Sequence, residues 1–362
     1  MIIQADCVAH MATMPADSVD AIVTDPPYGL GFMGKAWDKL PPGRDWAREC
    51  LRVLKPGGHI VAFGGQRTIH RLICSLEDAG FEIRDLLGWL QWQGFPKSRD
   101  VSKAIDAAAG AEREVLGPSP HSASRTTDNE GERTITVPAT DAAKQWDGWG
   151  TALKPCIEPA TIARKPLSER TVAANVLKWG TGAINIDACR YAVGDRAWPG
   201  PQDDYGAHTD GRWPANIYAC PKASRSEREA GCESLPAMAG YEAIGRKEGT
   251  KSIVGANRTA ATINNSHPTV KPVALMRWLV RLVTPPGGVV LDTFAGSGTT
   301  GVAAAYEGFD FLGIEINDDY CAISRARIAH ALGSDAPKKR RRPEAAPVEP
   351  DVVDPMQLDM WG

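Results

Sequence analysis

Apolar runs and amphipathic stretches alternate along residues 1–90 of the chain. β-branched and other apolar residues fill Val19–Thr24 and His59–Phe63, a pattern typical of strands buried on both faces of a parallel sheet. Apolar positions three and four apart predict helices between and after these strands. The expected elements are strands at Met1–Ala5, Val19–Thr24 and His59–Phe63, helices at Asp45–Leu54 and Arg67–Ala79, a helix terminator and turn at Lys55–Gly58, and a strand or hairpin at Phe81–Trp92.

The same alternation returns at about residue 266. The expected elements there are a helix at Val273–Val283, a strand at Val289–Leu291, a helix at Gly301–Tyr306, a strand at Phe309–Ile314 and a helix at Tyr320–Leu332. Strands that alternate with helices at both ends of the chain predict an α/β fold, with a mostly parallel sheet and helices on both faces.

Between about 93 and 265, Gly, Pro, Ser, Thr and charged residues dominate and apolar runs are short. This interval is expected to be loop-rich, with long loops at Arg113–Pro138 and Asp195–Gly211. Tryptophans interleave with basic residues in it, and two interpretations stay open: stacking surfaces with phosphate contacts, or the small core of an insertion. The residues are Trp146, Trp149, Trp179, Trp198 and Trp213, with Arg164, Lys165, Arg190, Arg212 and Arg225.

These changes in pattern divide the chain into four parts. We expect two halves of one α/β domain at 1–92 and 266–333, an inserted region at 93–265, and a tail at 334–362. The tail begins with the basic run Lys338–Arg342 and continues with Pro, Glu, Asp and Ala, a composition typical of disorder.

Composition argues against several classes of protein. The net charge of −3 argues against nucleic-acid binding by bulk charge alone, although a local basic groove is compatible with it. The eight cysteines form no Cys-x-x-Cys pair, so we expect neither a zinc site nor a disulfide framework. The N-terminus lacks the features of a secretory signal, and no apolar run reaches the about 18 residues of a membrane span. We therefore expect a cytoplasmic protein without a membrane segment.

The first candidate for chemistry is Asp25-Pro26-Pro27-Tyr28, directly after the apolar run that ends at Thr24. Neither proline offers a backbone N–H and both fix φ, so the chain must leave the sheet at Asp25. Ligands of open α/β sheets bind at the carboxyl ends of the strands, where this turn holds a carboxylate and an aromatic ring. A Pro-rich turn with a capping Asp and a core Tyr is the alternative interpretation.

A second motif follows the strand Val289–Leu291 and leads into a helix. Its glycines, Gly296 and Gly298, allow a tight turn and a close approach of the backbone to a ligand at a helix N-terminus. Glu315 ends the next strand, where a carboxylate would accept hydrogen bonds from two ribose hydroxyls. These features suit a nucleoside cofactor.

Together the motifs resemble those of the amino-group DNA methyltransferases, which use S-adenosylmethionine (AdoMet). Asp25–Tyr28 is similar to the catalytic motif IV of that family, Phe294–Gly298 to its cofactor motif I, and His267–Pro272 to its motif X. Their order along the chain resembles the circularly permuted β group, in which the variable region recognises the target. Stretches that resemble phage and prophage members are Gly94–Ser98, Trp149–Pro155 and Gly211–Asn216.

The resemblance covers about residues 1–330 and implies a Rossmann-like AdoMet-dependent methyltransferase sheet, circularly permuted. It implies a catalytic half at 1–92, a target-recognition insertion at 93–265 and a cofactor-binding half at 266–333. The implied catalytic residues are Asp25, Pro26, Pro27 and Tyr28, and no metal is implied. The implied cofactor-binding residues are Asp6, Lys271, Asp292, Phe294, Ala295, Gly296, Ser297, Gly298 and Glu315, with Asp6 matching the acidic motif III residue near the adenine.

The chemistry of an exocyclic amine fits these residue types. Its lone pair is delocalised into the ring of the base, so the amine is a poor nucleophile. The carboxylate of Asp25 and the carbonyl of Pro26 would accept its two N–H bonds and favour a pyramidal nitrogen with a usable lone pair. Tyr28 would stack on the target base after it is flipped out of the duplex.

The resemblance favours adenine N6 as the target, because Ser-Pro-Pro-Tyr is commoner than Asp-Pro-Pro-Tyr among cytosine-N4 enzymes. Cytosine-N4 methylation is the alternative within this chemistry, and methylation of a protein amide is a more distant one. Cytosine-C5 chemistry through Pro155-Cys156 would leave Asp25–Tyr28 without a role. A catalytically inactive DNA-binding module on the same scaffold is the alternative from another class.

The expected partner is double-stranded DNA, methylated at specific sites as in restriction–modification systems. Gln357–Trp361 resembles the peptide by which bacterial DNA-processing proteins dock on the replication sliding clamp, and a chance pentapeptide is the alternative. Some β-group relatives form dimers, so the resemblance also raises the expectation of a homodimer.

Overall fold

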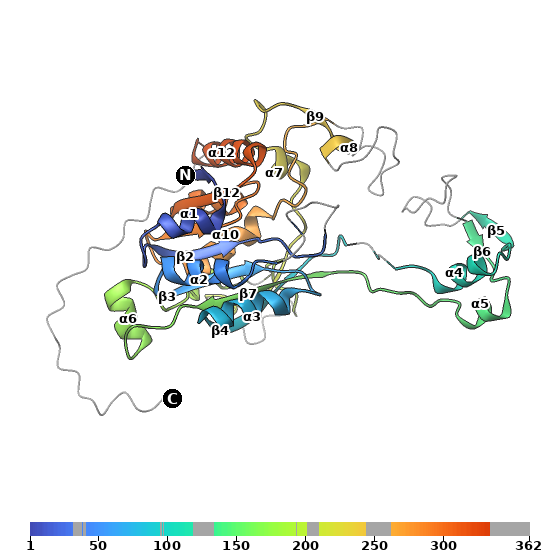
Figure 1. Ribbon diagram of the computed structural model, residues 1–362, viewed down its shortest axis with the longest axis horizontal. Helices are drawn as coiled ribbons and strands as arrows, with labels where there is room; N and C mark the ends of the chain where they lie inside the picture. The colour runs from blue at the N-terminus through green and yellow to red at the C-terminus, as the bar shows by residue number, and fades with distance from the viewer. Residues whose placement is uncertain are drawn as a thin grey trace.

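The computed structural model describes residues 1–31, 38, 41–94, 96, 98–118, 134–192, 194–200, 210–243 and 262–333. Within these ranges, an eight-stranded sheet forms the centre of the molecule (Figure 1). Its strands, in spatial order, are β1 (Ile2–Gln4), β12 (Asp310–Glu315), β11 (Val289–Asp292), β2 (Val19–Thr24), β3 (Leu54–Phe63), β7 (Ile157–Arg164), β4 (Glu82–Leu90) and β8 (Ile217–Ala219). All neighbouring strands are parallel except β7, which runs antiparallel to β3 and β4. The predicted mostly parallel α/β sheet is confirmed.

Helices cover both faces of this sheet, because its central strands are apolar on both sides. On β2, Ile22 belongs to one core and Val23 to the other, and both are fully buried. One face carries α1 (Cys7–Thr13), α2 (Arg44–Val53) and α3 (Ile69–Ala79). The other carries α10 (Val273–Val283) and α11 (Thr299–Glu307), with α12 (Asp318–Gly333) packed beside α11.

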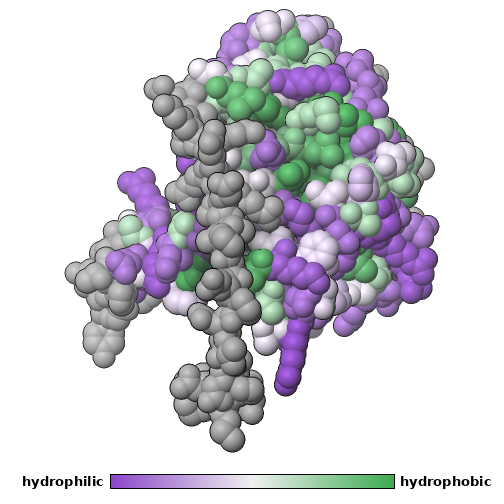
Figure 2. Space-filling model, turned by 90° about the vertical axis from the view of Figure 1, so that its left-hand side faces the viewer, coloured by the Kyte–Doolittle hydropathy of each residue, from purple (hydrophilic) through white to green (hydrophobic). Residues whose placement is uncertain are grey.

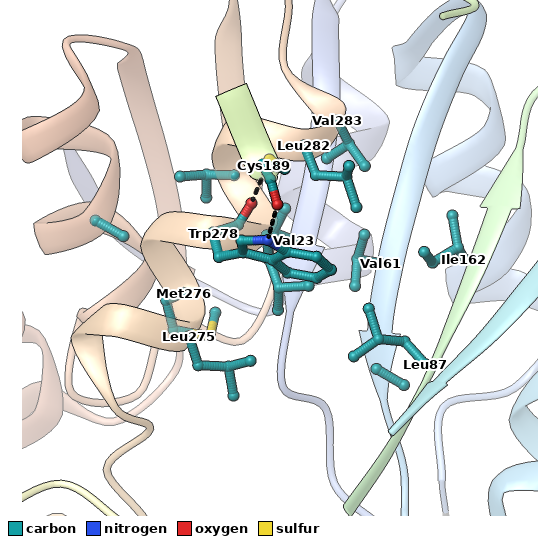
Figure 3. Close-up of a cluster of buried hydrophobic side chains, with 14 of the residues drawn as sticks. Val23, Val61, Leu87, Ile162, Cys189, Leu275, Met276, Trp278, Leu282 and Val283 are labelled. Carbon is teal, nitrogen blue, oxygen red and sulfur yellow. Dashed lines mark hydrogen bonds between the residues drawn. The ribbon is translucent and has the colours of Figure 1, made fainter. Parts of the chain in front are cut away.

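The larger core lies between α10 and the middle of the sheet (Figure 3). Trp278 of α10 is buried there, and its indole Nε1 donates to the backbone carbonyl of Cys189 at 3.1 Å. Cys189 ends the short helix η3 (Asp187–Cys189), so this bond ties a segment of the interval 93–265 to the sheet core. The figure shows the indole between Cys189 above it and the apolar side chains of the sheet.

A small lobe stands apart from the sheet in Figure 1. It carries α4 (Val101–Ala108), β5 (Val115–Pro118), β6 (Thr134–Thr136) and α5 (Asp141–Gln145). The buried carboxylate of Asp106 accepts hydrogen bonds from Arg113 Nη1 at 2.8 Å and from the backbone N–H of Thr140 at 3.0 Å. Charge-assisted hydrogen bonds thus join the two helices of the lobe. They stabilise a lobe that is too small for a large apolar core.

The remaining elements connect the lobe, β8 and α10. They are α6 (Val172–Trp179), α7 (Arg225–Glu229), β9 (Met238–Ala239), α8 (Gly240–Ala243) and β10 (Thr262–Ile263). Figure 2 shows polar side chains over much of one side of the molecule, with the largest group of apolar side chains in its upper part. Among the described helices, none combines the length and the apolar character that a membrane crossing needs.

The structure corrects two expectations from the sequence. The interval 93–265 was expected to be loop-rich, yet its residues Ile157–Arg164 form β7 in the middle of the sheet. Residues 55–58 were expected to end a helix and form a turn; α2 does end at Val53, but residues 55–58 lie inside β3 as an irregularity, because Val19 pairs with Leu54 and Ala21 already pairs with His59. The predicted tail 334–362, with Gln357–Trp361, lies outside the described residues.

Candidate active site

The two predicted motifs lie on neighbouring strands. β2 and β11 run parallel, with Leu291 beside Ile22, so both strands end at the same edge of the sheet. At that edge Thr24 Oγ1 donates to Asp292 Oδ1 at 2.7 Å, across 268 positions of sequence. The turn that begins at Asp25 and the glycine loop that follows Asp292 therefore form one site.

Asp25, Tyr28 and Lys271 form a cluster at this edge, in which Lys271 is buried and the other two are partly buried. Tyr28 OH donates to Asp25 Oδ1 at 2.9 Å, and Lys271 Nζ donates to Asp25 Oδ2 at 2.5 Å and to Tyr28 OH at 3.1 Å. The Lys271 ammonium also faces the rings of Phe63 and Trp89, with 4.8 and 6.0 Å to their centroids. The site thus holds a positive charge between a carboxylate and aromatic faces, the surroundings that a buried cation requires.

Charge within the cluster follows from burial and from its neighbours. Burial lowers the pKa of Lys271, but the carboxylates of Asp25 and Glu158 outweigh it, so the net pKa is raised and the ammonium stays protonated. Burial raises the pKa of Asp25 against the pull of Lys271. Burial and the Asp25 carboxylate raise the pKa of Tyr28, which keeps the phenol neutral and able to donate.

Asp38 fixes the backbone of the Asp-Pro-Pro-Tyr turn. Its Oδ1 accepts the backbone N–H groups of Tyr28 at 2.7 Å and Gly29 at 2.9 Å, and it is 2% exposed. Thr68 Oγ1 donates to the carbonyl oxygen of Tyr28 at 2.6 Å. These contacts come from separate segments and hold the ring and the carboxylate in one orientation, as a positioned active site needs.

The glycine loop is fixed by α12 and by Glu315 at the end of β12. Gly296 has a φ of 52°, and its backbone N–H donates to Glu315 Oε2 at 2.8 Å. Ser324 Oγ donates to the Gly296 carbonyl at 2.6 Å, and the buried Arg327 donates to the Ser297 carbonyl at 2.7 Å. Gly298, with a φ of 74°, caps the N-terminus of α11. The loop therefore has a single, well-supported shape at a helix N-terminus.

Asp292 supports this loop from within the sheet. Its carboxylate is 2% exposed and accepts hydrogen bonds from Thr24, Thr300 and the backbone N–H of Phe294. Burial raises its pKa to about 6, although these donors work against the rise. Asp292 thus joins β2, α11 and the loop, and its oxygens are already engaged by the protein.

Asp6 lies at the neighbouring strand end, as the sequence analysis expects. It is exposed and caps α1, accepting the Ala9 N–H at 2.9 Å, while the N–H of Ala5 donates to the Glu315 carbonyl at 3.0 Å. Asp25, Lys271, Asp292, the glycine loop, Glu315 and Asp6 thus all lie at one edge of the sheet. The roles of these residues stay predictions.

Glu158, at the start of β7, is a member of the site that the sequence analysis missed. Its Oε2 lies 3.6 Å from Lys271 Nζ, and its Oε1 lies 3.6 Å from Lys222 Nζ. Nothing in the local sequence of Glu158 or Asp38 signals a place in the site. Only the pairing of β7 between β3 and β4 brings Glu158 to this edge.

Both interpretations of the interleaved tryptophans find examples. Trp198 packs against the larger core, between α10 and the sheet. Trp213 is 63% exposed, and the Arg190 guanidinium lies over its ring, 5.0 Å from the centroid. In the lobe, Trp146 and Trp149 are exposed and make an edge-to-face pair with centroids 5.0 Å apart. An exposed Trp stacked with Arg offers the kind of surface on which nucleic-acid bases stack.

His267 makes stability depend on pH. Its ring is buried against Tyr320, its Nδ1 has no hydrogen-bond partner among the described residues, and burial lowers its pKa to about 3. Below pH 6.5 the unfolded chain takes up a proton at this position and the folded chain does not, so stability is lost as pH falls from 6.5 towards 3. Between pH 6.5 and 5 the free energy of unfolding should fall by about 2 kcal/mol through His267 alone.

Urea denaturation of the wild type, His267→Asn and His267→Gln at several pH values measures this loss. Both variants should show a shallower decline of the free energy of unfolding below pH 6.5. A decline as steep as in the wild type would contradict the assignment, and equal slopes in the two variants would assign the change to the imidazole.

Comparisons with known proteins find DNA methylases among the proteins similar to this chain. The family model N6_N4_Mtase, described as DNA methylase, matches residues 19–326. The type II methyltransferase M.HindIII of Haemophilus influenzae is 25% identical over 370 aligned positions, which cover 90% of this chain and 94% of that protein. Two solved structures are similar at lower identity. The M1.HpyAVI–SAM complex has 18% identity, a TM-score of 0.45 and coverage of 91% of this chain and 98% of that one. The cytosine-N4-specific PvuII DNA methyltransferase has 16% identity, a TM-score of 0.48 and coverage of 90% and 85%.

Proposed function

The chain belongs to the N6/N4 family of DNA methylases, and we propose that it transfers a methyl group from AdoMet to the exocyclic N6 of adenine at specific sites in double-stranded DNA. Methylation of DNA with AdoMet as donor follows from the family. The adenine target and the roles of single residues are the proposal. The observation that carries the residue roles is the Thr24–Asp292 hydrogen bond, which joins the strand before the Asp25–Tyr28 turn to the strand before the glycine loop.

The glycine loop fits the cofactor. Gly296 and Gly298 both have positive φ, and a Cβ would overlap His267 at the first and Ser324 at the second, so only glycine at these positions lets the backbone turn this tightly at the N-terminus of α11. Glu315 is partly buried at the next strand end, and its carboxylate would accept hydrogen bonds from the two ribose hydroxyls. The exposed carboxylate of Asp6 lies at the adjacent strand end, on the side where the adenine would bind.

Asp25, Pro26 and Tyr28 would act on the target base. The carboxylate of Asp25 and the carbonyl of Pro26 accept the two N–H bonds of the amine and leave its lone pair free to attack. AdoMet supplies a methyl group that its sulfonium already activates. As the nitrogen–carbon bond forms, the carbon–sulfur bond breaks and sulfur keeps the electron pair. The nitrogen then gives up one proton, for which Asp25 is the adjacent base. Tyr28 holds the flipped base by stacking.

Adenine is favoured over cytosine by the aspartate at position 25, and cytosine N4 is the alternative target. The intact cluster of Asp25, Tyr28 and Lys271 supports catalysis rather than an inactive DNA-binding module.

The permuted order is supported by the sheet, in which β2 lies beside β11 although the two strands come near opposite ends of the chain. A target-recognition role for 93–265, clamp binding by Gln357–Trp361 and a homodimer stay predictions from the sequence. The resemblance to phage and prophage members supports the cytoplasm of a bacterial or phage-infected cell as the location of the proposed enzyme.

Incubation of the protein with tritiated AdoMet and DNA, followed by digestion and nucleoside chromatography, tests the proposal. We expect the label in N6-methyl-2′-deoxyadenosine. Label in N4-methyl-2′-deoxycytidine would replace the target by the alternative, and AdoMet binding without any label in DNA would support the inactive module. Methylation-aware sequencing of DNA from cells that express the protein would then give the recognised site.

A further inference from the structure

The Lys271 ammonium occupies the place that the proposed function assigns to the target amine. Asp25 has two carboxylate oxygens, and Tyr28 OH and Lys271 Nζ each donate to one of them. Lys271 is 7% exposed, and the aromatic rings of Phe63, Trp89 and Tyr28 surround its ammonium. An incoming amine that donates to Asp25 Oδ2 therefore has to compete with a buried cation.

Displacing that ammonium without a second acceptor would be costly, because a buried charge that loses its partner destabilises its surroundings. Glu158 is such an acceptor. Its Oε2 lies 3.6 Å from Lys271 Nζ, on the β7 position paired with Trp89. A movement of about 1 Å would bring the ammonium into direct hydrogen-bond distance of Glu158.

The charges of the cluster also favour this exchange. While Lys271 is bound to Asp25, the two charges neutralise each other. When Lys271 is bound to Glu158, the Asp25 carboxylate keeps its negative charge facing the amine. That nitrogen gains positive charge as it takes the methyl group, and an uncompensated carboxylate in a low-dielectric site stabilises such charge strongly.

We infer that Glu158 is a positioning residue for methyl transfer, which takes over the Lys271 ammonium and leaves Asp25 free for the target amine. The inference rests on the proposed function. It predicts that Glu158 affects the chemical step and leaves cofactor binding unchanged, because it acts through Lys271 and Asp25 at the end of the site away from the glycine loop.

Glu158→Gln tests this, since it keeps the shape of the side chain and removes its charge. We expect kcat for DNA methylation to fall about tenfold or more, with the KM for DNA and the Kd for AdoMet within about twofold of the wild type. Tritium incorporation gives kcat and KM, and isothermal titration calorimetry gives the Kd. The matched control is Lys222→Gln, which removes the other cation 3.6 Å from Glu158, at the half-exposed rim, and should leave kcat within about twofold.

Three results would overturn the inference. They are a kcat of Glu158→Gln within twofold of the wild type, an equal loss of kcat in Lys222→Gln, and a loss of AdoMet affinity in Glu158→Gln that matches the loss of kcat. An inactive wild-type protein would instead contradict the proposed function itself. Failure of the inference about Glu158 and failure of the proposed function are therefore distinguishable.

Discussion

Replacing Asp25 with asparagine is expected to slow methyl transfer at least about a hundredfold, with the Kd for AdoMet within about threefold of the wild type. The asparagine carbonyl can still accept one hydrogen bond from the amine. It carries no charge to stabilise the nitrogen as that atom becomes positive, and it is a much weaker acceptor of the released proton. The cofactor loop is held by Asp292, Ser324 and Arg327, none of which contacts Asp25 through a described hydrogen bond.

The Asp25→Asn experiment needs a stability control, because the substitution removes an ionic partner of the buried Lys271 ammonium. Glu158 lies close enough to keep part of that compensation, so we expect a loss of only about 1–3 kcal/mol in the free energy of unfolding. Asp78→Asn, at an exposed position of α3, is the matched surface change and should alter neither rate nor stability. Full turnover in Asp25→Asn would show that methyl transfer needs neither the negative charge nor the basicity of Asp25. A parallel loss of AdoMet binding would place Asp25 on the cofactor side of the site.

The apolar pattern predicted the elements that are buried on both faces. The expected helix at Val273–Val283 matches α10 in both bounds, and Val19–Thr24 matches β2 in the same way. In these segments the burial that selects the apolar residues also determines the structure. Gly80 ends α3 in the left-handed conformation that glycine adopts at low cost at a helix C-terminus.

β7 was missed because its stability comes from its neighbours. Pro159 and the charged residues Glu158 and Arg164 break up its apolar pattern, and a proline argues against a central strand. In the structure the Pro159 carbonyl accepts the Gly64 N–H, and Arg164 forms an ion pair with Glu82 of β4. These partners are distant in sequence, so local pattern could not reveal them.

The candidate site was likewise predicted only in part. The rule that ligands bind at the carboxyl ends of strands predicted that Asp25 and the glycine loop would meet. It could not predict that Lys271 would bind Asp25, or that Glu158 and Asp38 would join the cluster. Those contacts depend on how three separate segments pack around the turn, and each residue type is common on protein surfaces.

The second large effect is expected at Gly298, where alanine should lower the affinity for AdoMet at least about tenfold and destabilise the fold. A φ of 74° is strained for any residue with a Cβ, at about 1–2 kcal/mol. The added Cβ would also lie 2.9 Å from the Cα of Ser324, which is backbone of α12 and cannot rotate away. Relieving that overlap requires α12 to move away from the loop and costs about 1–3 kcal/mol more. Ser324 and Arg327 would then lose their hydrogen bonds to Gly296 and Ser297, which hold the loop in shape.

Calorimetric titration with AdoMet and urea denaturation measure the two effects of Gly298→Ala. Gly88→Ala is the matched control, because its Cβ would meet Ile157 Cγ2 at an ordinary 3.5 Å and its φ is not positive. We expect the control to change the free energy of unfolding by less than about 0.5 kcal/mol and to leave the Kd for AdoMet unchanged. An affinity of Gly298→Ala equal to that of the wild type would show that the cofactor does not depend on the shape of this loop. The cofactor would then have to bind elsewhere along the strand ends, since a Cβ at position 298 cannot stand 2.9 Å from the Cα of Ser324 unless the loop or α12 moves.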